Sequence, residues 1–407
     1  MVSKPHPQVA ALSSISRENW RSMAGRLVLV ALLVVALAAR AEQISSSLHT
    51  FATGAPVPRT TYLPRFTEIA AAEGRPYRQF PVEYPPVSLG AIELVAGSDA
   101  NQTGIHLVWL MVVCDLLTAA ALAFGWGRRA AVSYLVLTVP LLGFLYMTID
   151  LLSAALAVGA VALLVRGRER VGGVALAAGV LAKVWPFVLG PLMVLERKRR
   201  AFVWWVGTLA LGMLTWVWWG GVSGVLQVAT QRHTPGWEYE SLVGSILWAL
   251  GHSFTSIKDS ARVGSAPGWA KALLLGAAVL GMAAVWYRAS RREPRELGLP
   301  AVAAVSILTL SAPLLSYPYM IWIVPWAAIA WTERTGYVRW LLAALMLVSG
   351  LLVVSYSSSL ADVALWSVKV TLLLRNALLV AVPAAYLLER RSVRPATTVV
   401  ERSVTPV

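Results

Sequence analysis

The sequence predicts an all-α polytopic membrane protein, a bundle of about 10–12 transmembrane helices with two long extracytoplasmic loops. Hydrophobic residues make up 57% of the 407 residues and charged residues only 14%, too little polar surface for a soluble chain of this length. Apolar runs of membrane length recur, and arginines cluster between them. The net charge of +15 is therefore spread over short clusters, which argues against a nucleic-acid partner.

Ten apolar runs are read as membrane helices, because a span needs ~20 residues with every backbone amide bonded internally. They cover residues 23–41, 105–125, 130–147, 150–165, 201–220, 269–287, 297–312, 318–331, 338–356 and 366–388. With the N-terminus in the cytoplasm, the arginine clusters between these runs all become cytoplasmic, as the positive-inside rule requires.

That agreement requires residues 171–195 to enter the membrane and return to the same side, because arginines flank both ends. The break is expected at Lys183-Val184-Trp185-Pro186, since proline cannot continue the amide ladder. One long kinked helix with a snorkelling lysine is the alternative.

The topology leaves residues 42–104 and 221–268 on the extracytoplasmic side, and both are too long for simple connectors. We expect a single membrane-embedded domain over residues 1–394 and a disordered cytoplasmic tail over residues 395–407. Within the first loop, residues 65–74 predict a short amphipathic helix. Residues 87–97 are apolar but too short to span, so they are expected to dip into the outer leaflet.

Ionisable side chains in or beside a membrane are costly, which makes each one a candidate functional group. Asp150 begins a helix at the outer surface, where capping explains it as well as catalysis does. Asp115 lies midway along its helix and is expected to bond a neighbouring helix. Lys183, Lys369 and Arg375 would all point toward the outer half of the bundle and suggest an anion site. A phosphate or Asp150 would then pair with Arg375.

The second outer loop concentrates groups that suit a sugar phosphate. Arg232 and His233 are followed by Trp237 and Glu240. Arginine can donate two parallel hydrogen bonds to a phosphate, aromatic faces can stack on sugar rings, and carboxylates can accept hydrogen bonds from sugar hydroxyls. An interfacial aromatic belt with a polar loop is the competing explanation.

The first outer loop holds Tyr77, Glu83 and Tyr84 in a stretch with four prolines. Glu83 directly precedes the predicted outer-leaflet helix. A carboxylate partly removed from water there would be a good proton acceptor for a hydroxyl. A rigid turn with a solvated glutamate is the alternative.

Five stretches, taken in order, resemble glycosyltransferase family 87, the polyprenyl-phosphate-mannose-dependent mannosyltransferases of the GT-C superfamily. They are Gly74-Arg75-Pro76-Tyr77 with Glu83-Tyr84-Pro85-Pro86, Ile149-Asp150-Leu151-Leu152, Ala182-Lys183-Val184-Trp185-Pro186, Gly236-Trp237-Glu238-Tyr239-Glu240-Ser241, and Ser316-Tyr317-Pro318-Tyr319 continuing to Pro325. The resemblance implies a GT-C fold with a large first outer loop beside a lipid-facing cleft. It implies a hexosyltransferase that moves a sugar, typically mannose, from a polyprenyl phosphate to a glycolipid or glycan, with inversion. No nucleotide, metal or other cofactor is implied.

The sequence departs from the family pattern at the catalytic base. Family members usually carry an aspartate shortly before a tyrosine that aligns near Tyr62, whereas here the stretch reads Pro58-Arg59-Thr60-Thr61. Gln79 also stands where an aspartate is common. Either Glu83, Glu68, Glu240 or Asp150 serves as base, or activity is lost; Glu83 is the first choice.

The remaining roles follow from the chemistry that the resemblance implies. Lys183, Arg232 and Arg375 are nominated to stabilise the leaving phosphate. His233, Tyr77, Tyr84, Trp237 and Tyr319 are nominated to bind substrate.

These assignments require Glu83, Lys183 and the Trp237 region to meet in one outer pocket. The rival function is a transporter or a non-catalytic polyprenyl-lipid-binding protein, because broken helices also occur in transporters. The alanine- and arginine-rich composition suggests a GC-rich bacterium and hence its plasma membrane.

Overall fold

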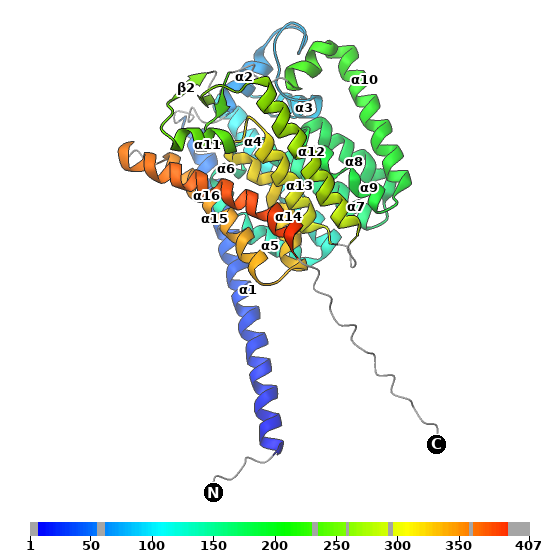
Figure 1. Cartoon of the computed structure of the whole chain (residues 1–407), viewed down its shortest axis with the longest axis vertical. Helices are drawn as coiled ribbons and strands as arrows, with labels where there is room; N and C mark the ends of the chain where they lie inside the picture. Colours follow the sequence, from blue (N-terminus) through cyan, green and yellow to red (C-terminus); the bar gives the residue numbers. More distant parts are fainter. Residues whose placement is uncertain are drawn as a thin grey trace.

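The computed structural model describes residues 7–54, 62–229, 235–257, 260–291, 296–357 and 361–389, and these residues are predominantly helical (Figure 1). The helices are α1 (Pro7–Ala52), α2 (Leu63–Ala71), α3 (Pro86–Val95), α4 (Ala100–Trp126), α5 (Arg128–Leu137), α6 (Leu142–Leu145), α7 (Asp150–Val165), α8 (Glu169–Ala182), α9 (Pro191–Leu195), α10 (Arg199–Ala229), α11 (Leu242–Ala249), α12 (Gly268–Ser290), α13 (Gly298–Ser311), α14 (Met320–Glu333), α15 (Tyr337–Ser357) and α16 (Ala361–Leu388). Three short 3-10 helices join them: η1 (Val139–Leu141), η2 (Trp185–Leu189) and η3 (Tyr317–Tyr319).

Each of the ten predicted runs coincides with a helix or a bent helix pair, which confirms an all-α polytopic membrane protein. Within the described residues, six helices are long and apolar enough to cross a bilayer, namely α1, α4, α10, α12, α15 and α16. A seventh span results if the bent α5–α6 pair counts as one. The helices α7, α13 and α14 have 16, 14 and 14 residues, fewer than the ~20 of a full span. By length, therefore, the described helices give six or seven full spans, and the other predicted runs form shorter helices.

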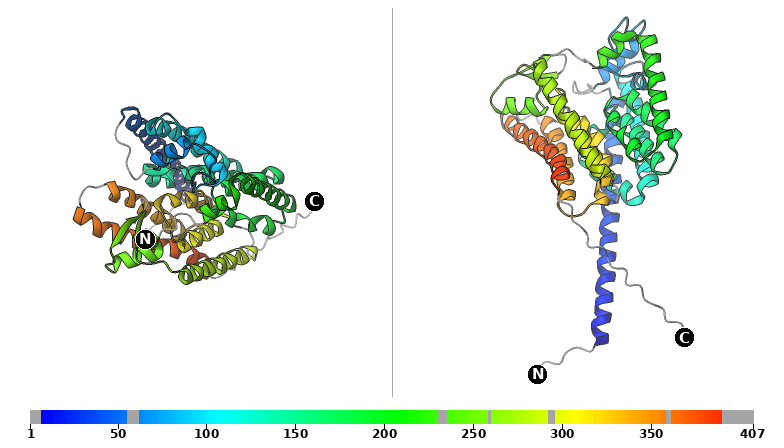
Figure 2. Two further views of the ribbon diagram at one scale, coloured as in Figure 1. Left: turned by 90° about the horizontal axis from the view of Figure 1, so that it is seen from above. Right: turned by 45° about the vertical axis from the view of Figure 1, so that its right-hand side comes forward.

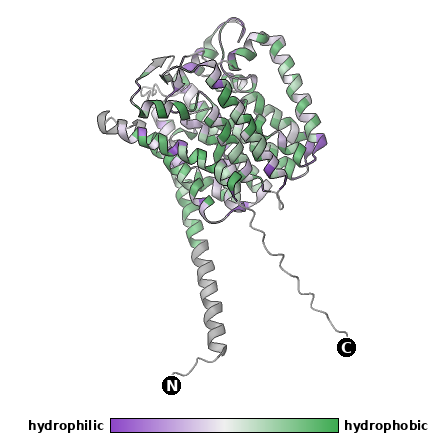
Figure 3. Cartoon of the chain, in the orientation of Figure 1, coloured by the Kyte–Doolittle hydropathy of each residue, from purple (hydrophilic) through white to green (hydrophobic). Residues whose placement is uncertain are grey.

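The outer surface of the bundle is apolar, as contact with lipid requires. Figure 3 shows mostly hydrophobic helices, with hydrophilic segments gathered toward the ends. Trp218, Leu280 and Trp340 are 79%, 73% and 75% exposed. Water would disfavour such a surface, whereas lipid tails would cover it.

Residues 171–195 form the predicted hairpin. The helix α8 ends at Ala182, and its C-cap Lys183 has an extended backbone with φ −156° and ψ 137°. Pro186 lies in the 3-10 helix that follows. A Cβ atom on Gly173, near the start of α8, would overlap the carbonyl oxygen of Ala201, near the start of α10. The segment therefore ends at the same end of the bundle at which α8 begins. A single long kinked helix would have ended at the opposite end, so this alternative is excluded.

The two long loops fold over the same end of the bundle, called here the loop end because α2, α3 and a small β-sheet lie there (Figure 1). The predicted amphipathic helix is α2, which buries Leu63, Phe66 and Ile69. The sheet has the order β1 (Trp237–Glu238), β3 (Ser260–Val263), β2 (Phe254–Ile257), with antiparallel neighbours. The opposite end carries the arginines that follow α7 and precede α10, and is called the arginine end.

The helices fall into two groups that lie side by side (Figure 2). The first runs from α2 to α10, and the second from α11 to α16. The helices α7 and α14 are in contact across the boundary between the groups. This contact brings together segments more than 150 residues apart in the chain.

Candidate functional site

An ion pair between Asp150 and Lys183 lies at the loop end of the bundle. Lys183 Nζ is 2.5 Å from Asp150 Oδ1. Asp150 is the first residue of α7, where the helix dipole favours a carboxylate, and the break after α8 places Lys183 opposite it. The Ser88 hydroxyl of α3 donates to the Ala182 carbonyl at 2.7 Å, so the first outer loop lies directly against the hairpin tip.

The two members of this pair differ in exposure. The side chain of Asp150 is 5% exposed and that of Lys183 is 24% exposed. The Lys183 side chain is therefore the more accessible member of the pair, whereas the carboxylate is nearly enclosed.

A second donor reaches the same carboxylate oxygen from the other group of helices. The Trp322 indole N–H of α14 donates to Asp150 Oδ1 at 2.7 Å. Both donors act on Oδ1, and no side chain or backbone group among the described residues donates to Oδ2. Asp150 is thus fixed through one oxygen and keeps the other as an acceptor.

Three aromatic rings, called here the aromatic stack (Trp185, Trp322 and Tyr319), lie beside the ion pair, and two of them contact Lys183. The Tyr319 and Trp322 rings stack at 3.9 Å, and Trp322 and Trp185 stack at 5.6 Å. Lys183 Nζ lies 5.4 Å from the Tyr319 ring centre and 5.1 Å from that of Trp322, within cation–π range. The Trp185 indole in turn donates to the Ser153 hydroxyl at 2.8 Å. Tyr319 and Trp322 therefore add cation–π contacts to the ion pair that Lys183 makes with Asp150.

Tyr317 connects this site to the second outer loop. Burial, followed by the carboxylates of Glu240, Asp150 and Glu238, raises the pKa of the Tyr317 phenol to about 12. The Glu238 N–H also donates to the Pro313 carbonyl at 3.0 Å. The loop before α14 therefore lies between the Asp150–Lys183 pair and the Trp237 region.

Glu240 and Arg375, both predicted site residues, bind each other. Arg375 Nη1 lies 2.8 Å from Glu240 Oε2, and Nη2 donates to the Glu240 backbone carbonyl at 2.5 Å. Arg375 is 0% exposed and Glu240 is 2% exposed. The partner expected for Arg375 was a phosphate or Asp150, whereas the structure provides Glu240. Because both side chains are shielded from solvent, we interpret this ion pair as a structural contact between the second outer loop and α16.

Glu83 is held by Arg65 of α2. Arg65 Nε lies 2.9 Å from Oε1, and Nη2 lies 2.8 Å from Oε2. The hydrogen bond to Glu83 is the largest cause that raises the pKa of Arg65. Both carboxylate oxygens of Glu83 are therefore engaged, and no polar contact among the described residues joins Glu83 to Lys183.

Tyr77 fastens the first outer loop to α10. It is 2% exposed and adopts a positive φ of 67°. Its hydroxyl donates to the Tyr84 carbonyl at 2.5 Å, and the Gln227 amide donates to the Tyr77 carbonyl at 2.8 Å. Its ring packs against Trp216 at 5.5 Å. These contacts indicate that Tyr77 is a structural residue in the packed interior of the first outer loop.

The other predicted site residues lie in different surroundings. Tyr84 is 8% exposed and meets the Phe66 ring edge-on at 5.5 Å. Trp237 is 3% exposed within the sheet. Arg232 and His233 lie outside the described residues.

Sequence reasoning included Tyr317 and Trp322 in the fifth matching stretch without giving either a role, and it did not name Ser153. A signal was present for Trp322, because it stands three residues after Tyr319 and therefore on the same helical face. Ser153 likewise stands three residues after Asp150. No comparable spacing marks Tyr317, whose role depends on the fold.

The sequence profile of Glycosyltransferase family 87 matches residues 82–318, more than half of the chain. The chain belongs to glycosyltransferase family 87. The predicted resemblance is thus confirmed, and this family 87 member is a membrane glycosyltransferase. The matched range contains Asp150, Lys183 and Glu240, while Trp322 and Arg375 lie beyond it. A search of curated proteins gave no match.

Proposed function

We propose that this family 87 glycosyltransferase transfers a hexose, with mannose the first candidate, from a polyprenyl phosphate to a hydroxyl of a glycolipid or glycan. The loop end would face the outside of a bacterial plasma membrane, with the N-terminus in the cytoplasm. No cofactor is needed for this transfer. The observation that carries the proposal is the Asp150–Lys183 pair, in which the cation is partly exposed and the carboxylate has one oxygen free of donors among the described residues.

Lys183 is assigned to the phosphate of the donor. An ammonium has three N–H donors, and one of them is used on Asp150. The others are available to phosphate oxygens, whose negative charge increases as the sugar–phosphate bond breaks. The Tyr319 face beside Lys183 offers a surface on which the sugar ring can lie.

Asp150 is assigned as the base. The acceptor oxygen attacks the anomeric carbon from the face opposite the phosphate and forms the new glycosidic bond. The carbon–oxygen bond to the phosphate breaks, and its electron pair leaves with the polyprenyl phosphate anion. The hydroxyl proton passes to Asp150 Oδ2, and the anomeric configuration inverts.

Asp150 is preferred to the other two carboxylates for a geometric reason. Arg65 occupies both oxygens of Glu83, and Glu240 is sealed against Arg375. The proposal therefore moves the base from Glu83, the first choice from sequence, to Asp150.

The test is a transfer assay with purified protein in nanodiscs, radiolabelled polyprenyl-phosphate mannose and a bacterial membrane lipid extract as acceptor. Asp150→Asn is expected to lower kcat by about 10²- to 10⁴-fold, and Lys183→Gln to lower kcat and weaken donor binding. The matched controls are Asp99→Asn, which keeps the cap of α4, and Lys271→Gln at the exposed start of α12. Both should retain activity.

Two outcomes would overturn the proposal. If Glu83→Gln abolishes transfer while Asp150→Asn retains it, Glu83 is the base. If no polyprenyl-phosphate hexose supports transfer but labelled lipid crosses vesicles that contain the protein, the transporter function is correct.

A further inference from the structure

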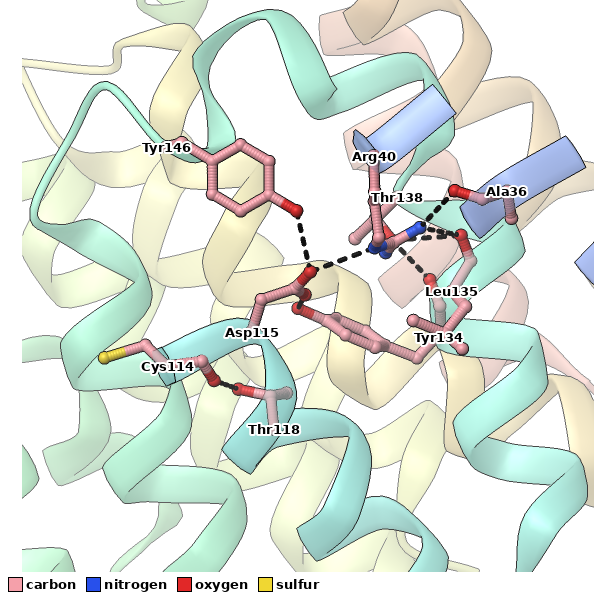
Figure 4. Close-up of polar contacts among 9 residues, drawn as sticks. All are labelled: Ala36, Arg40, Cys114, Asp115, Thr118, Tyr134, Leu135, Thr138 and Tyr146. Carbon is pink, nitrogen blue, oxygen red and sulfur yellow. Dashed lines mark hydrogen bonds and ion pairs between the residues drawn. The ribbon is translucent and has the colours of Figure 1, made fainter. Parts of the chain in front are cut away.

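A further buried ion pair, between Arg40 and Asp115, joins α1 to α4 (Figure 4). Arg40 Nε lies 2.9 Å from Asp115 Oδ2, and the two side chains are 7% and 5% exposed. The Tyr134 hydroxyl donates to Asp115 Oδ1 at 2.6 Å, and the Tyr146 hydroxyl donates to Oδ2 at 2.9 Å. The carboxylate thus accepts three donors from three different segments of the chain, so the bond to a neighbouring helix predicted for Asp115 is present.

The two terminal nitrogens of the Arg40 guanidinium donate hydrogen bonds to residues at the break between α5 and α6. Nη1 donates to the Leu135 carbonyl at 2.7 Å, and Nη2 donates to the Thr138 hydroxyl. Leu135 is in the last turn of α5, where carbonyls lack partners within the helix. The chain bends by 42° at this break, and Pro140 cannot restore the ladder. An unpaired carbonyl is costly inside a membrane, so Arg40 stabilises the bend.

The bend leads directly to the proposed active site. Tyr146 follows α6 and stands four residues before Asp150. This short connection is held at one end by the Tyr146–Asp115 bond and at the other by Lys183 and Trp322 on Asp150. The Phe144 ring also meets Tyr317 edge-on at 5.0 Å.

We infer that Arg40, Asp115 and Tyr146 are positioning residues that fix Asp150 relative to Lys183. This inference rests on the proposed function, since it concerns the residue assigned as base. Arg40 binds both Asp115 and the residues at the break between α5 and α6. Asp115 in turn accepts a hydrogen bond from Tyr146, which fixes the chain four residues before Asp150 at the start of α7. None of the three touches the reacting groups.

Tyr134 provides an internal comparison. Its hydroxyl bonds the same carboxylate, and its side chain is buried like that of Tyr146. Tyr134 lies on α5 before the break, however, and Tyr146 lies after it. A purely structural network would respond equally to the loss of either hydroxyl, whereas a positioning network would respond mainly to the loss of the Tyr146 hydroxyl.

The experiment compares Tyr146→Phe with Tyr134→Phe. Both variants are expected to unfold at similar, slightly lowered temperatures. Tyr146→Phe should lower kcat by about tenfold or more, because small displacements of a catalytic group are costly, while the donor KM changes little. Tyr134→Phe should keep kcat close to the wild-type value. Equal kcat values in the two variants would overturn the inference.

A second readout does not depend on turnover. The intact membrane protein is treated with an amine-acylating reagent, and the rate at which Lys183 is modified is then measured by digestion and mass spectrometry of the peptides. If Tyr146 holds Asp150 against Lys183, modification should be faster in Tyr146→Phe and unchanged in Tyr134→Phe. Equal rates would refute the positioning role. If the wild type transfers no sugar, the proposed function fails, while the acylation rates still decide the geometry.

Discussion

Replacing Glu240 with glutamine tests whether the Glu240–Arg375 pair fastens the second outer loop to α16. The Arg375 side chain is 0% exposed and the Glu240 side chain 3% exposed, so neither charge can be hydrated when its partner is lost. Removing one member of such a pair costs about 3–5 kcal/mol. Glutamine retains an oxygen for the 2.8 Å bond from Nη1, and the Glu240 backbone carbonyl and Asn376 remain in place. The expected loss is therefore about 3 kcal/mol, near the lower limit.

The assay is equilibrium unfolding in detergent micelles, followed by circular dichroism, for Glu240→Gln, Arg375→Met and the double variant. Arg375→Met should cost more than Glu240→Gln, because it leaves an ionised carboxylate without its buried cation. The double variant should be more stable than Arg375→Met, since replacing both charges removes the unpaired one. If Arg375→Met unfolds like the wild type but weakens donor binding, Arg375 binds the phosphate and the structural explanation is refuted.

Two further predictions concern stability. In Gly224→Ala the new Cβ would lie 2.9 Å from Tyr77 Cβ, so we expect a loss of about 1–3 kcal/mol in the same unfolding assay; wild-type stability would show that the loop does not depend on this close contact. Glu333 lies beyond the predicted membrane segment at the arginine end, and burial raises its pKa from 4.5 to about 7. The contribution of Glu333 to stability should therefore be largest below pH 4.5 and decrease by about 3 kcal/mol as the pH rises to 7; the difference in stability between the wild type and Glu333→Gln should follow this curve, and a difference that does not change with pH would contradict it.

The fold was largely predictable because it follows from local rules. Apolar length, arginine clusters and Pro186 were sufficient to locate the helices and the α8 hairpin. The bounds of α7, α13 and α14 also agree with the predicted runs to within two residues, but with 16, 14 and 14 residues these helices are shorter than a full span.

The partners of the charges were not predictable to the same degree. Sequence shows that Arg375 needs a counter-charge inside the membrane, but not that Glu240, 135 residues away, supplies it. Asp115 was correctly expected to bond a neighbouring helix, yet nothing in the pattern points to Arg40. Such pairs depend on long-range packing of the helices, which a single sequence does not encode in any local spacing.

The three buried ion pairs described above suggest how a membrane protein separates structural charge from chemical charge. The pairs Arg40–Asp115 and Arg375–Glu240 have cations only 7% and 0% exposed, so a third charged group could enter only by opening the core. The Lys183 side chain is 24% exposed, and its ammonium can meet a phosphate without leaving Asp150. The desolvation cost of the Asp150–Lys183 pair is incurred when the protein folds. A phosphate that binds Lys183 therefore adds an electrostatic attraction and does not require another charged side chain to be buried. This difference in the exposure of the cation is the reason to assign the phosphate to Lys183, whereas Asp150, itself only 5% exposed, is assigned as base because no described residue donates to its Oδ2.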